Sequence, residues 1–139
     1  MVKSKVYIAS RYALRNKAAN VAQRLRDTGQ FVIVSTWHDG AKDWEGAPTE
    51  EEVKTIAQKD YDEVFDADIL LALSDQPGAL FPYGSHHIEF GLAYAWEKQC
   101  VVVGPLELMF HRLSGVLHYE NLNEFLEATT NDEPYAYGQ

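Results

Sequence analysis

The chain has 139 residues, a formal net charge of −9 and a hydrophobic content of 46%. This length is typical of one domain, and this hydrophobic content is sufficient for a packed core. The acidic balance argues against general binding to nucleic acid polymers or anionic membranes, because both require clustered Lys and Arg. A single nucleotide needs only local donors and remains compatible with the composition.

The sequence also shows no sign of membrane insertion or disulfide bonding. No apolar run approaches the roughly 18 residues of a membrane span, and the opening MVKSK lacks the apolar stretch of a signal peptide. We therefore expect a cytoplasmic protein. Cys100 is the single cysteine, which excludes an internal disulfide and a cysteine-built zinc site.

Apolar residues alternate along the chain between short runs, which predict strands, and helical spacing, which predicts helices. In chain order the predicted elements are strand 6–9, helix 14–27, strand 31–35, helix 49–66, strand 69–73, helix 85–98, strand 100–103, strand 116–119 and helix 122–128. Gly29 ends the first helix. Thr49 is the expected N-cap of the second helix, whose first turn is acidic.

Strands that alternate with helices predict right-handed crossovers and a mainly parallel sheet with helices on both faces. We expect one α/β domain over residues 1–128, with a sheet of about five strands. The tail over residues 129–139 reads TTNDEPYAYGQ and has few aliphatic residues, so we expect no strong helix there.

Ligands of such sheets bind at the carboxyl ends of the strands, near the point where the strand order reverses. Most of the unusual polar and aromatic residues follow predicted strands, at Ser10, Arg11, Thr36, Trp37, His38, Asp39 and in segments 74–87 and 104–107. The first turn after a strand reads ASRYALR and lacks the glycine fingerprint of a dinucleotide-binding fold, and a P-loop is also missing.

One acidic residue is placed unusually within a helix. The segment GSHHIEFGLAYAWEKQ, residues 84–99, sets Glu89 among apolar neighbours, whereas Glu97 and Lys98 supply the solvated end of the helix. A carboxylate in such surroundings is a candidate catalytic group. If Ser85 caps this helix, the backbone dipoles of its early turns favour the ionised form of Glu89.

Three stretches, KVYIASRY, DYDEVFDADILLAL and GSHHIEFGLAYAWEKQCVVVG, together resemble the nucleoside 2-deoxyribosyltransferase family. Relatives of that family include N-glycosidases that hydrolyse deoxynucleoside monophosphates. The match runs in the same order from Lys5 to Glu127. It implies a flavodoxin-like, doubly wound sheet and cleavage of the N-glycosidic bond of a 2′-deoxynucleoside or its 5′-monophosphate.

The resemblance also implies roles for three residues. In the family, the glutamate of an E-h-G-x-A pattern is the nucleophile, and Glu89 occupies that position. An aspartate that orients the sugar or the nucleophile corresponds to Asp60, and a tyrosine beside the nucleophile corresponds to Tyr7. A covalent deoxyribosyl-enzyme would then pass its sugar to another base or to water.

The chain departs from the transferases just before the Glu89 helix. Those enzymes carry acidic residues there, where this chain reads YGSH, so the base preference is not carried over. The nucleotide hydrolases resemble one another in a serine- or glycine-rich stretch at this point and an arginine after the first strand. We expect substrate contacts from Ser10, Arg11, Arg15, Trp37, Gly84, Ser85 and His86, in part as a phosphate site.

The residues alone leave simpler interpretations open. Asp60 fits the solvated face of an acidic helix, and the resemblance is what favours a functional role. Tyr7 fits a strand residue packed against a helix equally well. Arg11 and Arg15 are one helical turn apart and also fit an ordinary surface pair.

Adjacent His86 and His87 suggest a metal site, to which His38 and Asp39 could lend ligands. Neighbouring residues on a helix point apart and the expected reaction needs no metal, so we expect neither a metal nor another cofactor. Loop aromatics such as Trp37, Trp44, Phe81 and Tyr83 are typical of stacking on a flat base.

The family is oligomeric, which implies a homo-oligomer whose neighbouring subunit completes the pocket. Candidate contact residues are the apolar wall Leu92, Ala93, Ala95 and Trp96, and Tyr135 and Tyr137 of the tail. Two function classes stay open: an N-glycosidic enzyme, or a catalytically silent nucleotide-binding or sensing domain of the same fold. The combination of Glu89, Asp60 and Tyr7 favours the enzyme.

Overall fold

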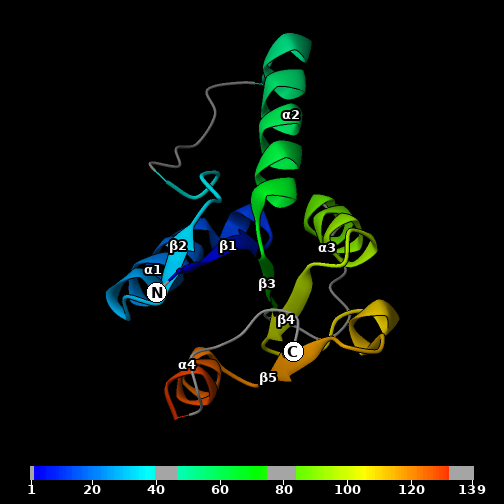
Figure 1. Cartoon of the computed structure of the whole chain (residues 1–139). Helices are drawn as coiled ribbons and strands as arrows, with labels where there is room; N and C mark the ends of the chain where they lie inside the picture. The colour runs from blue at the N-terminus through cyan, green and yellow to red at the C-terminus, as the bar shows by residue number, and fades with distance from the viewer. Residues whose placement is uncertain (1, 40–46, 75–83, 132–139) are drawn as a thin grey trace.

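The computed structural model describes residues 2–39, 47–74 and 84–131 and contains a five-stranded parallel sheet in the order β2-β1-β3-β4-β5 (Figure 1). This is the strand order of flavodoxin-like folds, so the predicted fold class is confirmed. The elements are β1 (Ser4–Ala9), the 3-10 helix η1 (Tyr12–Leu14), α1 (Arg15–Asp27), β2 (Phe31–Ile33), α2 (Glu50–Asp66), β3 (Ile69–Leu73), α3 (Ser85–Ala95), β4 (Gln99–Val103), η2 (Met109–Arg112), β5 (Leu117–Tyr119) and α4 (Leu122–Asn131).

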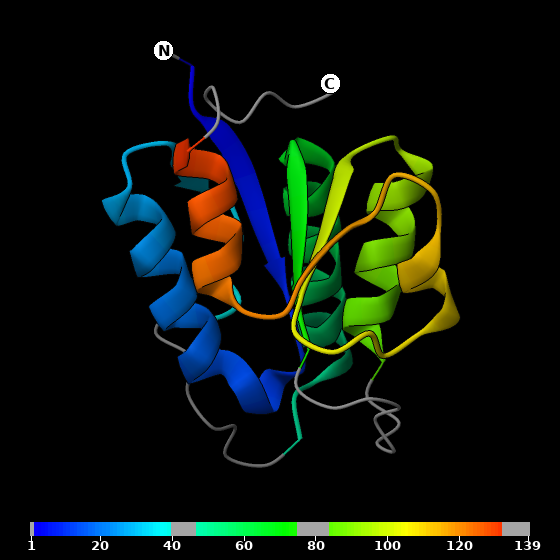
Figure 2. The ribbon, with the colours of Figure 1, turned by 90° about the horizontal axis from the view of Figure 1, so that it is seen from below.

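Helices cover both faces of the sheet, with α1 and α4 on one side and α2 and α3 on the other (Figure 2). Successive residues of a strand point to opposite faces. In β1, Val6 and Ile8 therefore join the core beneath α1 and α4, while Tyr7 and Ala9 join the core beneath α2 and α3. The phenol ring of Tyr7 thus lies on the side of the sheet that carries Glu89.

The C-terminal ends of two helices differ from the predictions. Helix α3 ends at Ala95 rather than at residue 98, because Glu97 adopts a left-handed conformation with φ of 62°. Helix α4 continues to Asn131, three residues past the expected end at Ala128. The hydroxyls of Thr129 and Thr130 donate to the carbonyl of Leu126, so neither residue ends the helix. The tail from residue 132 lies outside the described residues, and so do Tyr135 and Tyr137.

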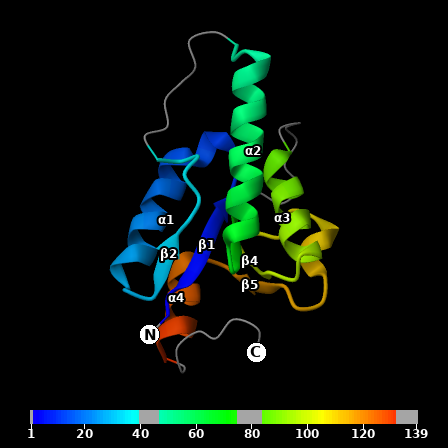
Figure 3. The same cartoon turned by 45° about the horizontal axis from the view of Figure 1, so that its top comes forward.

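Helix α2 begins as predicted. The side chain of Thr49 accepts the backbone N–H of Glu52, and the Glu52 carboxylate accepts the backbone N–H of Thr49, forming a capping box. Val64 is the buried residue of α2. The N-terminal half of this helix extends beyond the sheet (Figures 1 and 3). Residues near the end of α2 therefore approach the body of the molecule, whereas the first turns do not.

The apolar wall on α3 belongs largely to the core of its own chain. Ala93 is fully buried, Leu92 and Trp96 pack against the same cluster, and Ala95 is exposed. The Trp96 ring also meets two rings of α2 edge-on, those of Tyr61 and Phe65. Contact with a second copy is therefore not needed to explain this wall, contrary to the expectation from sequence. Exposed apolar side chains lie on α2, at Val53, Ile56, Tyr61 and Phe65, and also elsewhere, for example at Ile88 of α3 and Met109 of η2.

Within the described residues, no helix has both the length and the apolar character required for a membrane span.

Candidate active site

The strand order reverses between β1 and β3, and the ends of these strands are tied together. The Ser10 hydroxyl donates to the carbonyl of Leu73, the last residue of β3, at 3.0 Å. The backbone N–H of Ser74 donates to the carbonyl of Val103 at the end of β4. A flavodoxin-like sheet binds ligands at this edge, so the surrounding side chains define the candidate site.

The central contact of the site joins Tyr7 of β1 to Glu89 of α3. The buried Tyr7 hydroxyl donates to Glu89 Oε2 at 2.7 Å, across a sequence separation of 82 residues. Burial and the nearby negative charges of Glu89 and Asp60 raise the pKa of Tyr7. The phenol therefore stays protonated and remains a donor to Glu89. The structure brings these two predicted residues together.

The electrostatic setting of Glu89 differs from the expectation. Burial is the largest effect and raises its pKa from an ordinary 4.5 to about 8, and the charges of Asp60 and Glu63 act in the same direction. The Tyr7 hydrogen bond favours the ionised form but does not offset burial. Burial of the carboxylate therefore disfavours the ionised form of Glu89 that its early position in the helix led us to expect.

Asp60 reaches the same region from α2. Burial, followed by repulsion from Glu63, raises its pKa to about 6. Its Oδ1 atom is buried and makes no hydrogen bond within the described residues. Its charge contributes to the raised pKa values of both Tyr7 and Glu89, which places Asp60 in their electrostatic neighbourhood. This arrangement differs from the fully solvated helix face that the residues alone also allowed.

Glu63 is a residue of the site that the sequence analysis did not identify. Its carboxylate accepts the backbone N–H of Thr36 at 3.1 Å and the Thr36 hydroxyl at 2.7 Å. It thereby fixes the segment after β2 to α2. The signal in the sequence was its position three residues after Asp60, which places both carboxylates on one helix face.

Trp37 packs as a structural residue at the carboxyl ends of the strands. Its indole N–H donates to the carbonyl of Ile8 at 2.6 Å, and its half-buried ring contacts both core clusters. The ring also lies 6.4 Å from that of Tyr12, measured between centroids. These contacts hold the indole in place, and stacking of a base on it stays a prediction. Trp44, Phe81 and Tyr83 lie outside the described residues.

The predicted phosphate-binding residues have local contacts of their own. The Arg15 guanidinium donates to the carbonyl of Tyr12 and lies over the Tyr12 ring, 4.7 Å from its centroid. Arg11 is half-buried between β1 and η1. The Ser10 hydroxyl donates its proton to the carbonyl of Leu73 in β3. A clamp of these residues around a phosphate therefore stays a prediction.

The start of α3 corrects the expected cap. Gly84 is the N-cap residue, Ser85 is the first residue of the helix, and no side chain of the described residues caps it. The N–H of His87 bonds to the carbonyl of Gly84, as the first helical turn requires. Because the leading N–H groups of a helix have no partner within the helix, this end is suited to bind an anion.

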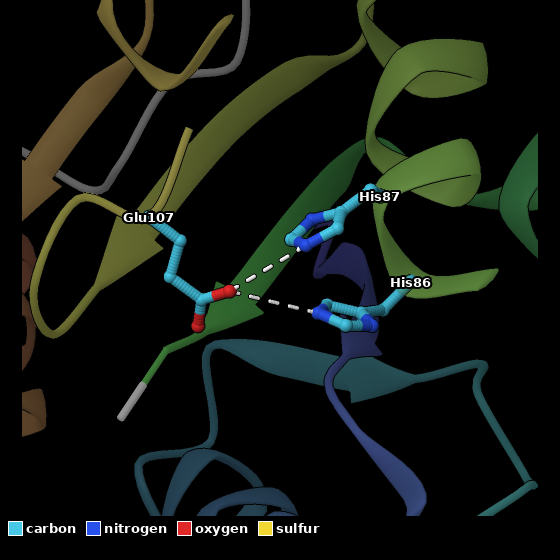
Figure 4. Close-up of side chains that lie close together, drawn as sticks. All are labelled: His86, His87 and Glu107. Carbon is cyan, nitrogen blue, oxygen red and sulfur yellow. Dashed lines mark ion pairs between the residues drawn. The ribbon is translucent and has the colours of Figure 1, made fainter. Parts of the chain in front are cut away.

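His86 and His87 do not point apart, contrary to the argument from helical spacing. Their ring centroids lie 3.9 Å apart, and both rings turn toward Glu107 from the segment after β4 (Figure 4). The Nε2 atoms of His86 and His87 lie 3.8 and 3.5 Å from Glu107 Oε2. Burial lowers the pKa of His87, which favours its neutral form.

His38 does not belong to this cluster, so the possibility that it lends a metal ligand to His86 and His87 is not supported. Its buried ring places Nε2 2.8 Å from the Ser35 hydroxyl, and that hydroxyl accepts the backbone N–H of Ile8. His38 Nδ1 lies 3.2 Å from Asp39 Oδ1. The two residues stabilise the segment after β2.

A scan against protein-family models finds no match for this chain, and a search of curated proteins finds none. Solved structures do match. One is a 2-deoxyribosyltransferase from the psychrotolerant bacterium Bacillus psychrosaccharolyticus, with a TM-score of 0.68 and 20% identity, covering 96% of this chain and 100% of that one.

Two further structures match over nearly the whole chain. The CMP N-glycosidase BcmB from Clostridium botulinum has a TM-score of 0.56 and 18% identity, covering 92% of this chain and 99% of its own. A conserved protein from Enterococcus faecalis V583 has a TM-score of 0.57 and 19% identity, covering 98% of this chain and 80% of its own. At these identities the similarities establish the fold.

Proposed function

We propose that this chain cleaves the N-glycosidic bond of a 2′-deoxynucleoside or its 5′-monophosphate, with Glu89 as the nucleophile. The observation that carries the proposal is the buried Tyr7–Glu89 hydrogen bond beside the point where the strand order reverses. A carboxylate held in a desolvated site by a phenol donor is suited to attack an electron-poor sugar carbon.

The reaction requires two displacements at C1′ of the sugar. A Glu89 oxygen bonds to C1′ while the C1′–N bond breaks, and the bonding electrons leave with the base, which takes a proton from solvent. A second base or a water molecule then attacks C1′, gives up a proton to solvent and releases Glu89 as a carboxylate. Both transition states develop positive charge on the sugar ring, and the adjacent carboxylate stabilises that charge.

Tyr7 fixes the Glu89 carboxylate for this attack. Its hydroxyl contacts one oxygen, Oε2, which leaves the other oxygen for C1′. Because Glu89 has a pKa of about 8, only a minor fraction of it is ionised at neutral pH. The ionised fraction, and with it the rate of attack, should therefore rise with pH up to about 8.

Asp60 is proposed to hold a sugar hydroxyl or the leaving base. Its pKa of about 6 makes it partly protonated near neutral pH, so it can donate as well as accept a hydrogen bond. The buried Oδ1 atom makes no hydrogen bond within the described residues and can accept one from the substrate. Glu63 acts through position, because it fixes Thr36 and the segment that follows β2.

A 5′-phosphate would bind at the start of α3. The Gly84 N-cap and the leading N–H groups of this helix suit an anion, and Ser85 is exposed there. We propose that Arg11 and Arg15 supply the positive charge, with Ser10, Trp37 and His86 as further substrate contacts. The named structural neighbours support the substrate class, because one is a 2-deoxyribosyltransferase and the other a CMP N-glycosidase.

A substrate panel tests the proposal. The protein is incubated with each 2′-deoxynucleoside and each 5′-monophosphate, with and without a second free base, and the products are separated by chromatography. Release of base indicates hydrolysis, and formation of a new nucleoside indicates transfer. Glu89→Gln is the matched control, because it keeps the shape of the side chain and removes the nucleophilic charge.

The result against the proposal is binding of these compounds without either product. That outcome would support the silent nucleotide-binding domain of the same fold. Turnover by Glu89→Gln at the wild-type rate would instead reject Glu89 as nucleophile while leaving the activity itself in place.

A further inference from the structure

We propose that His86, His87 and Glu107 form a binding site for a divalent transition-metal ion of the Zn²⁺ type. The two histidines come from the first turn of α3, and Glu107 comes from the segment after β4 (Figure 4). One ligand atom from each residue lies within 4.8 Å of the others. The site goes beyond the proposed N-glycosidic reaction, which needs no metal.

The distances fit an ion better than direct hydrogen bonds. In a tetrahedral zinc site, bonds of about 2.0–2.2 Å place neighbouring ligand atoms about 3.4 Å apart. Glu107 Oε2 lies 3.5 Å from His87 Nε2 and 3.8 Å from His86 Nε2. Hydrogen bonds between such atoms are about 2.7–3.2 Å long. Small rotations of the side chains would bring all three atoms to zinc-binding distance.

The direction of the rings supports the same conclusion. Adjacent helical residues are normally about 100° apart around the axis, since a turn takes 3.6 residues. The rings of His86 and His87 nevertheless lie side by side, and their Nε2 atoms approach the same oxygen of Glu107. Two imidazoles and one carboxylate are a common ligand set for Zn²⁺.

The carboxylate is buried and held in position. The Glu107 side chain is 2% exposed. The backbone N–H of Glu107 donates to His111 Nδ1 at 3.2 Å, and the His111 ring packs edge-on against Phe90 of α3. The segment after β4 is thereby anchored to the helix that carries both histidines.

The start of that segment is constrained as well. Gly104 has a φ of +111°, and a side chain there would collide with the backbone carbonyl of Ser74. The Ser74 hydroxyl in turn donates to the carbonyl of Pro105. These contacts fix the backbone two to three residues before Glu107, and a fixed backbone helps to preorganise a ligand.

Three protein ligands leave a fourth position of a tetrahedral ion for water or for another ligand. His86 lies three residues before Glu89 on the same helix, so the ion would sit near the first turn of the helix that carries the proposed nucleophile. The inference revises the expectation, drawn from sequence, that no metal binds.

Equilibrium dialysis of the protein against Zn²⁺ tests the site directly. The protein carries no polyhistidine tag and is first stripped with a chelator, and bound metal is measured by elemental analysis. We expect one Zn²⁺ per chain. His87→Ala and Glu107→Gln should each weaken binding about tenfold or more. Glu127→Gln is the matched control for Glu107→Gln, because Glu127 is exposed on α4 and is not one of the three ligands; this variant should bind Zn²⁺ with wild-type affinity.

A Co²⁺-loaded sample gives a second readout, since a four-coordinate site should show strong visible absorption that Glu107→Gln abolishes. His87 is 26% exposed, so its substitution should leave the fold intact, which circular dichroism verifies. Failure of the wild type to bind Zn²⁺ overturns the proposal, as does full affinity in His87→Ala. Neither result depends on any glycosidic activity.

Discussion

Replacement of Tyr7 by Phe removes one hydroxyl from the candidate site and leaves the ring in the core. That hydroxyl donates to Glu89 Oε2 at 2.7 Å and is the contact that lowers the pKa of Glu89. Hydrogen bonds to charged groups contribute about 1.5–3 kcal/mol, against about 0.5–1.5 kcal/mol for neutral ones. The Tyr7 hydrogen bond is therefore stronger to ionised than to protonated Glu89 by about 1.4 kcal/mol, which corresponds to one pKa unit.

The expected result is a pKa of Glu89 that moves from about 8 to about 9. Below pH 8 the variant should be about tenfold slower than the wild type, because its ionised fraction is about tenfold smaller. The difference should narrow above pH 9. The measurement is kcat/KM against pH, since this ratio reports the ionisation of the free enzyme.

A direct titration of the Glu89 carboxyl by ¹³C NMR supplies the same pKa without any substrate. Tyr94→Phe is the matched control, because the Tyr94 hydroxyl also projects from α3 but donates to the carbonyl of Ser114. It should leave the pKa of Glu89 and the pH profile unchanged. The reasoning is refuted if Tyr7→Phe leaves the titration of Glu89 where it is, or moves it to lower pH.

Four further predictions follow from the same structure. Glu89→Gln should lose turnover by several orders of magnitude, yet gain up to about 3 kcal/mol of stability at pH 7. The folded pKa of about 8 lies above the ordinary 4.5, so the wild type loses stability as pH rises between these two values. Thermal unfolding near pH 4.5 should therefore show no gain in stability for the variant. Asp60→Asn removes a charge that raises the pKa of Glu89, so the pH profile should move to lower pH, opposite in sign to Tyr7→Phe; a shift upward would contradict the account. Arg11→Ala or Arg15→Ala should raise KM for a 5′-monophosphate far more than for the nucleoside, and equal effects would reject the phosphate clamp. We also predict a homo-oligomer, at least a dimer, that forms through the exposed apolar side chains of α2. Light scattering should show the oligomer, and Ile56→Glu should weaken it. A wild-type monomer at micromolar concentration would exclude this prediction.

The sheet was predictable from the sequence because its strands are short runs of apolar residues. All of β3 is buried, so Ile69–Leu73 shows no polar residue that could obscure the pattern. Thr49 caps α2 as predicted, since capping depends on neighbours a few residues away, and Glu52 completes a capping box. The end of α3 was not predictable, because the left-handed conformation of Glu97 carries no clear local signal.

The candidate site was predictable only through the resemblance. Tyr7 and Glu89 are 82 residues apart, and their contact depends on how β1 and α3 pack across the sheet. The raised pKa of Glu89 was missed because it comes from burial and from charges on α2, neither of which local sequence reports. The convergence of His86 and His87 on Glu107 was missed for a similar reason, since the segment after β4 is positioned by tertiary contacts.

Trapping of the covalent intermediate tests whether Glu89 is the nucleophile. A reaction with a cleavable deoxynucleoside or deoxynucleotide is quenched in acid during turnover, digested with a protease and analysed by mass spectrometry. The account predicts a deoxyribosyl adduct on the peptide that contains Glu89, and no adduct in Glu89→Gln. Release of base by a Glu89→Gln protein at the wild-type rate, with no adduct on the wild-type Glu89 peptide, would contradict it.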